Sequence, residues 1–328
     1  MFLPIWEVKM KQRTWISEEL EAARIKVQYD EHVKRVLGSR QVLARILKGA
    51  AAEYEGYSVE EIVSWIDTDI EIARTPLRPG GKVKEDSLIT GDNTESKIPG
   101  EGCITYDIRF RAWIPGDEDP SMIKLLINIE AQKSFYLKYR IVTRGIFYGA
   151  RMISEQLDRE FTASDYNGLK KVYSIWICMN APKKIGNAMT EYRITKRDII
   201  GRMPERKASY DKLSVVIICL YGGKNKRGPG DLHGFLNTLL SSYLEVEEKE
   251  KILVQKYGMD MEREMGEELK EMCNLSEAIE EQGIEQGIEQ GLLLAKKIIT
   301  LAKEGRSEEK IAEICGISVD KVREITED

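Results

Sequence analysis

The chain has little of several residues on which common protein classes depend. Only two histidines, His32 and His233, occur in 328 residues, so histidine-based catalysis or metal binding has almost no material. The five cysteines are scattered and form no Cys-x-x-Cys pair, which disfavours both a zinc site and a disulfide framework. The sequence also lacks a run of about eighteen apolar residues that would cross a bilayer. We therefore expect no membrane partner.

A secretory signal is also missing from the start of the sequence. The first fifteen residues, MFLPIWEVKMKQRTW, contain no basic stretch followed by an apolar stretch. Hydrophobic residues make up 42% of the chain, which is enough for an ordinary core. These observations predict a cytoplasmic protein with one large or two modest domains.

Negative charge is concentrated at one end of the chain. The net charge is −5, but residues 245–328 contain 23 acidic and 12 basic residues, or −11, which leaves +6 for residues 1–244. A mildly basic body permits contact with DNA phosphates without requiring it. We interpret the charges of the acidic tail as a solvated face.

Two strands joined by a polar turn are predicted between Cys103 and Lys133. Apolar and polar residues alternate over 104–112, as they do in a half-buried strand. Residues 115–121 contain the Pro, Gly and Asp needed to reverse the chain. A second strand is predicted over 122–133. The hairpin thus carries an Asp on one strand and a Glu-x-Gln on the next.

Asp107, Glu130 and Gln132 are the polar residues of interest in this hairpin. A carboxylate at mid-strand is costly to bury unless it is paired, hydrogen-bonded or bound to a metal. Hard cations such as Mg²⁺ prefer carboxylate oxygens and take substrate phosphate as a further ligand. The spacing alone therefore leaves two interpretations open: a divalent-metal site, or acids exposed on a solvated sheet face.

The same residues resemble the core of PD-(D/E)xK nucleases. Asp107 stands in the place of the motif Asp, with Tyr106 instead of the motif Pro, and Glu130 stands as the motif acid. Gln132 occupies the position where Lys is usual. A Gln at this position resembles the Rpn group of recombination-promoting nucleases and putative transposases.

The resemblance extends along nearly the whole chain. The segment YDEHVKRVL (Tyr29–Leu37) is similar to the Asp-x-x-aromatic-Lys opening of the Rpn group, with Val33 in the aromatic position. Gln156 also fits the group. The residues MCNLS (Met272–Ser276), followed by Glu-x-Gly repeats, resemble its clostridial-type branch.

This resemblance implies an α/β fold with a PD-(D/E)xK restriction-endonuclease-like core, in which helices flank a mixed central sheet, and a C-terminal helical tail. It implies a metal-dependent DNA endonuclease of recombination-promoting or transposase-associated type. Asp107 and Glu130 would bind Mg²⁺ or Mn²⁺, and Gln132 would orient the attacking water. Asp30 is a further candidate metal ligand on the first helix, with an ordinary surface acid as the alternative.

A helix predicted over 137–157 places Arg144, Tyr148 and Arg151 on one face. In the nuclease fold this helix packs beside the active site. Arg144 and Arg151 are therefore candidates for bidentate contacts with the DNA phosphate. The alternative is an amphipathic helix with an exposed basic edge.

Three parts are predicted: a nuclease-like domain over 1–244, an acidic helical segment over 245–303 and a small helix-turn-helix-like tail over 304–328. The repeat EQGIEQGIEQGL (Glu281–Leu292) places a Gly in every fourth position. Each mid-helix Gly costs about 1 kcal/mol, which packing against a second copy would offset. A homodimer through this tail is one interpretation, and slippage of a short DNA repeat in a tolerant linker is the other.

Two stretches rich in Gly and Pro are predicted as loops. Thr75–Glu101 is either a flap over DNA or a tolerated excursion. Tyr221–Asp231 is a basic turn that could touch the DNA backbone.

Because Gln132 carries no positive charge, the alternative function is a weak or inactive nuclease-like module that binds DNA or protein, with a regulatory acidic tail. A third interpretation of the function is a partner-dependent antiphage or toxin component.

Overall fold

The computed structural model describes residues 15–68, 70–72, 95–98, 102–115, 122–132, 135–162, 164–221 and 231–326. The chain divides into a unit of residues 27–273 and a second unit that joins 1–26 with 274–328. This division differs from the predicted boundaries at 244 and 303. Leu253 and Leu269 lie beyond residue 244 but are fully buried, and Arg45 Nη2 donates a hydrogen bond to Tyr257 O at 2.7 Å. The segment after 244 therefore packs with the body.

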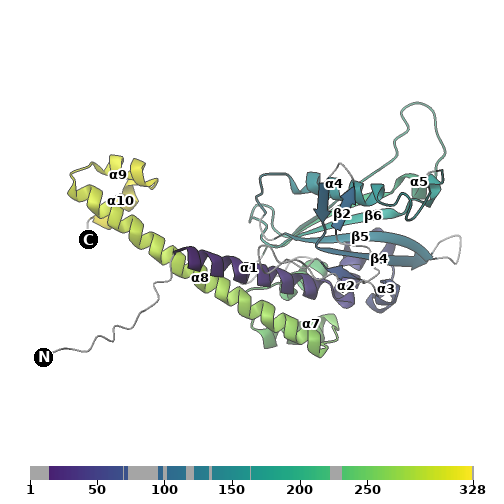
Figure 1. Ribbon diagram of the computed structural model, residues 1–328, viewed down its shortest axis with the longest axis horizontal. Coiled ribbons are helices and arrows are strands. Elements are labelled where there is room, and N and C mark those ends of the chain that lie inside the picture. The colour runs from purple at the N-terminus through teal and green to yellow at the C-terminus, as the bar shows by residue number, and fades with distance from the viewer. Residues whose placement is uncertain are drawn as a thin grey trace. The chain divides into compact units, whose positions relative to one another are not determined.

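A six-stranded mixed sheet forms the centre of the unit 27–273 (Figure 1). Parallel pairing joins β5 to β6 and β6 to β8, and the remaining neighbours are antiparallel. The strands in spatial order are β1 (Glu71–Ile72), β4 (Ile108–Pro115), β5 (Met122–Gln132), β6 (Lys171–Cys178), β8 (Leu213–Cys219) and β7 (Ala188–Arg193). The predicted α/β class with a mixed sheet is confirmed.

Strand β6 lies in the middle of the sheet and is buried on both faces. Val172 and Trp176 pack on one face with residues of helix α4 (Ile141–Ser154). Tyr173 points to the opposite face, where its hydroxyl bonds Glu53 of the short 3-10 helix η1 (Ala52–Tyr54). The sheet is therefore covered on both sides.

Helices lie on both faces of the sheet, with α4 on one side and α2 and α3 on the other (Figure 1). A second short 3-10 helix, η2 (Tyr166–Gly168), precedes β6. The remaining helices are α1 (Trp15–Leu37), α2 (Arg40–Ala50), α3 (Val59–Trp65), α5 (Lys207–Tyr210), α6 (Asp231–Leu239), α7 (Val246–Tyr257), α8 (Arg263–Lys303), α9 (Glu308–Cys315) and α10 (Val319–Thr326).

The segment predicted as the first strand of the hairpin forms two separate strands, each in a different sheet. Residues Gly102–Thr105 form β3, which pairs with β2 (Glu95–Ile98) in a separate two-stranded sheet. Tyr106 and Asp107 lie between β3 and β4 in neither strand. The prediction of one continuous strand over 104–112 is therefore wrong, because the alternation of apolar residues continues through the bend.

The second unit contains the last two helices of the chain. Ile298, Ile311, Ala312 and Val322 form a small buried core there. Gly316 ends α9 with φ +66°, a left-handed conformation that favours glycine. The described part of the chain contains no helix with the length and apolarity to cross a membrane. Most of the predicted loop over 75–101, and residues 222–230 of the basic turn, lie outside the described residues.

Candidate functional site

Asp107 and Glu130, the two predicted metal ligands, come together beside the end of the β4–β5 ladder. Glu130 Oε1 accepts a hydrogen bond from the backbone N–H of Asp107 at 3.0 Å. Asp107 Oδ2 in turn accepts one from the backbone N–H of Ala131 at 3.1 Å. Each carboxylate is thus oriented by the backbone beside the other, immediately after the ladder pair of Ile108 with Ile129. The bend at Asp107 makes this crossed arrangement.

A lysine from helix α1 joins the two acids. Lys34 Nζ lies 2.7 Å from Asp107 Oδ1, and the two side chains are only 13% and 20% exposed. Sequence reasoning did not single out Lys34, although it is the Lys of the segment that resembles the Asp-x-x-aromatic-Lys opening. The motif was the available signal, but the spacing gives no indication that this lysine meets Asp107.

Glu130 is the more buried of the two acids, with 5% of its surface exposed. Burial raises the pKa of the Glu130 carboxyl well above its usual value, and the negative charge of Asp107 raises it further. The Asp107 N–H and the charges of Arg144 and Lys34 act in the opposite direction. The carboxyl therefore binds a proton more tightly than an ordinary glutamate.

Arg144 of α4 is held beside the acids by aromatic side chains. Its guanidinium donates to the hydroxyl of Tyr139, and Nη2 donates to the hydroxyl of Tyr148 at 2.5 Å. The guanidinium also lies over the ring of Trp176, with Cζ 5.3 Å from the centroid. These contacts fix the orientation of a half-buried cation whose charge acts on Glu130.

Arg151 is buried, whereas Arg144 on the same helix is only half-buried. The predicted common face of Arg144, Tyr148 and Arg151 exists, but it points towards the sheet, and Arg151 is 3% exposed. Arg109 Nη1 of β4 lies 2.9 Å from Oε2 of Glu155, the residue that follows α4, in a buried ion pair. Arg151 therefore has almost no surface with which to meet a phosphate, whereas contact by Arg144 stays a prediction.

Gln132 and Asp30 lie in different surroundings. Gln132 is half-buried on β5, two residues beyond Glu130, and none of the described residues forms a hydrogen bond with its side-chain amide. Its register partner on β6 is Cys178. Asp30 is exposed on α1, one helical turn before Lys34. The structure thus brings the lysine of this segment, rather than Asp30, into contact with Asp107.

The candidate donors for a metal ion are the oxygens of Asp107 and Glu130, although Asp107 Oδ1 faces Lys34 and Asp107 Oδ2 and Glu130 Oε1 each accept a backbone N–H. Within the described ranges, no group of three or more His, Cys, Asp or Glu side chains could hold a metal, so Asp30 is not gathered with this pair. Mg²⁺ often takes one or two carboxylates and completes its shell with water and phosphate. No described residue donates to Glu130 Oε2. The pair therefore fits the chemistry of Mg²⁺ or Mn²⁺.

Comparison with known proteins found no matching family model, no similar curated protein and no similar solved structure. The resemblance to the Rpn group therefore rests on the residues and motifs of the sequence itself.

Proposed function

We propose that this protein is a metal-dependent DNA endonuclease that hydrolyses phosphodiester bonds, with Asp107 and Glu130 in its active site. The observation that carries the proposal is the crossed pair of carboxylates, each hydrogen-bonded to the backbone beside the other. The proposal includes a PD-(D/E)xK core, since a mixed sheet with an Asp at the bend before one strand and a Glu on the adjacent antiparallel strand, beside a helix, agrees with that resemblance.

The electrostatics of the pair favour a divalent cation. Burial, and after it the negative charge of Asp107, raises the pKa of Glu130, so the fully ionised pair is costly in this poorly solvated site. A cation held by Asp107 and Glu130 would offset this cost and allow both acids to ionise. When bound, Mg²⁺ or Mn²⁺ would supply charge stabilisation at the phosphate and activation of a water nucleophile.

The other residues of the site have positioning roles in this proposal. Lys34 orients Asp107 through their ion pair and contributes positive charge, which Gln132 cannot supply. The Gln132 amide would orient water by hydrogen bonding. Arg144, restrained by Tyr139 and Tyr148, would contact a non-bridging phosphate oxygen.

Plasmid nicking by the purified protein tests the proposal. Nicking should require Mg²⁺ or Mn²⁺, stop with EDTA and fall at least about 100-fold in Glu130→Ala. Glu60→Ala, which removes an exposed glutamate of α3, is the matched control and should retain activity. Equal activity of wild type and Glu130→Ala would contradict the proposal. Absence of nicking with every metal, together with intact DNA binding, would favour the binding-module alternative.

A further inference from the structure

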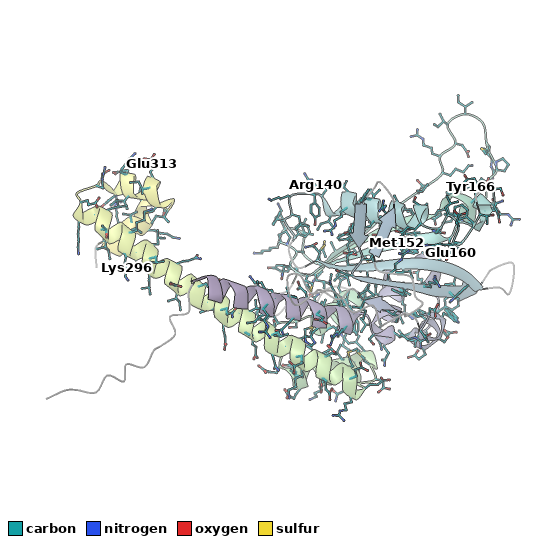
Figure 2. All side chains as sticks on the ribbon, viewed as in Figure 1. Arg140, Met152, Glu160, Tyr166, Lys296 and Glu313 are labelled. Carbon is teal, nitrogen blue, oxygen red and sulfur yellow. The ribbon has the colours of Figure 1, made fainter. Side chains whose placement is uncertain are left out.

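The segment that joins β7 to α5 extends away from the sheet as a long loop (Figures 1 and 2). We call residues 193–207, with sequence RITKRDIIGRMPERK, the basic arm; it runs from the last residue of β7 to the first residue of α5. It contains six basic and two acidic residues, a net charge of +4, in a chain whose net charge is −5. Positive charge is therefore concentrated on one projecting element, which favours an anionic partner.

The tip of the basic arm also exposes apolar side chains. Ile199 is 86% exposed, Ile200 is 96% exposed and Met203 is 69% exposed. Large apolar side chains that are grouped and nearly free of contacts indicate an interaction surface more strongly than scattered ones do. A partner that covers this tip must accept both positive charge and apolar surface.

Contacts within the basic arm hold this tip in a closed loop. Asp198 Oδ1 lies 2.7 Å from Lys196 Nζ and accepts a hydrogen bond from the backbone N–H of Met203 at 3.4 Å. Gly201 has φ +66°, which lets the chain turn between these anchors. The four residues 199–202 are thus presented together at the end of the arm.

The two acids of the basic arm are used internally, whereas two arginines are not. Glu205 accepts from the backbone N–H of Arg206 at 2.9 Å, and Asp198 is paired as described above. No described residue accepts a hydrogen bond from the guanidinium of Arg197 or Arg202. These two arginines flank the isoleucine pair in the sequence Arg-Asp-Ile-Ile-Gly-Arg. The tip therefore combines an apolar wedge with a cation on either side.

We propose that the basic arm binds duplex DNA, with Arg197 and Arg202 on phosphates and Ile199 and Ile200 against a base step. Neutralisation of phosphates by arginine and lysine supplies a large share of DNA affinity, and apolar side chains can wedge between base pairs and kink the duplex. A second copy of the basic arm is a poor partner, since it would oppose positive charge with positive charge. The inference rests on the proposed function because that function makes DNA the substrate. Beyond that function, the inference assigns DNA binding and bending to the basic arm.

Fluorescence anisotropy with the full-length protein and a labelled DNA duplex tests the inference. The duplex has about 25 base pairs, a length suited to a bent site. EDTA is present throughout, so that binding is measured without cleavage. The double variant Arg197→Gln/Arg202→Gln should bind at least about tenfold more weakly, and its salt slope should be about 1.8 less negative, as expected for two lost phosphate contacts. The control Lys303→Gln/Arg306→Gln removes the same charge from exposed positions of the acidic tail and should leave both quantities unchanged.

The apolar wedge has its own readout. A 2-aminopurine base in the duplex should brighten when wild type binds and unstacks a base step, and Ile199→Ser/Ile200→Ser should lose this signal. Circular dichroism checks that each variant is folded. An unchanged affinity and salt slope in the arginine variant would overturn the inference. So would an isoleucine variant that loses self-association in sedimentation but keeps wild-type DNA binding. Either result would leave metal-dependent nicking as a separate, independently testable property, and loss of nicking in Glu130→Ala would leave the role of the basic arm intact.

Discussion

Lys34 Nζ lies 2.7 Å from Asp107 Oδ1, and this ion pair ties helix α1 to the bend that precedes β4. The contact has two consequences. It holds one oxygen of Asp107 while the other is bonded to the backbone of β5, and it places positive charge beside two acids. Lys34 therefore contributes both to the geometry of the site and to its electrostatic balance.

Lys34→Met should destabilise the metal-free protein by about 1–2 kcal/mol, between the values typical of exposed and buried ion pairs. The reason is that Asp107 and Glu130 would lose a neighbouring cation in a poorly solvated place. Urea unfolding in EDTA measures the change. Lys26→Met removes an exposed lysine from the same helix and should alter stability by less than about 0.5 kcal/mol. Equal effects of the two substitutions would contradict a structural role for the ion pair.

The pKa of Glu130 predicts how stability depends on pH when metal is absent. Burial raises this pKa in the folded protein above its value in the unfolded chain, so the folded state binds the proton more tightly. The associated stability is present below the unfolded pKa and is lost as pH rises through the folded pKa. Glu130→Gln, which is neutral at every pH, should lack this loss and become the more stable protein at high pH. Thermal unfolding in EDTA across a pH series tests this, and parallel curves for the two proteins would contradict it.

Two glycines in helices should respond in opposite ways to substitution by alanine. A Cβ at Gly145 would lie 2.6 Å from Val215 Cγ1 and 2.9 Å from Trp176 Nε1, so Gly145→Ala overpacks the α4–sheet contact. The overpacking cost of about 1–3 kcal/mol outweighs the gain in helix propensity. A Cβ at Gly283 of α8 would meet no atom within 4 Å, so Gly283→Ala should stabilise its helix by up to about 1 kcal/mol. Thermal unfolding of both variants measures the signs, and stabilisation by Gly145→Ala would show that the packing at α4 is looser than described.

Self-association through the repeat in α8 stays a prediction. Ile284 and Ile288 are 56% and 60% exposed and lie one turn apart, and added Cβ atoms at the repeat glycines would meet open space. The same helix of a second copy of the chain could therefore pack closely against the repeat. Sedimentation equilibrium should give a dimer for wild type and a weaker dimer for Ile284→Ser/Ile288→Ser, with Ile314→Ser as a control at an apolar residue that is 41% exposed. A wild type that is monomeric at all concentrations would contradict the prediction.

The sheet could be predicted from the sequence where residue patterns are local. The apolar runs of β6 and β8 identify buried strands, and Ser58 with Glu61 three residues later forms the capping box that marks the start of α3. The proximity of Asp107 and Glu130 follows from the pairing of β4 with β5, which the polar turn between them predicts. Fold class and the acid pair are therefore readable from spacing and from the family resemblance.

The remaining features depend on contacts that spacing does not encode. The break before β4 is hidden because Tyr106 and Ile108 keep the alternation of a single strand, and both are buried. The meeting of Lys34 with Asp107 depends on the packing of a helix against the sheet. The burial of Arg151 could not be distinguished from an exposed basic edge, since either gives the same helical period. These features arise from tertiary packing.

Manganese binding measured by electron paramagnetic resonance tests most directly whether Asp107 and Glu130 form a divalent-cation site. Titration of the full-length protein with Mn²⁺ should show one site per chain that Mg²⁺ displaces. The double variant Asp107→Asn/Glu130→Gln keeps the shape of both side chains but removes their charge, and it should lose this site while the control Glu60→Ala retains it. Equal Mn²⁺ binding by wild type and the double variant would contradict the assignment of the metal to this pair.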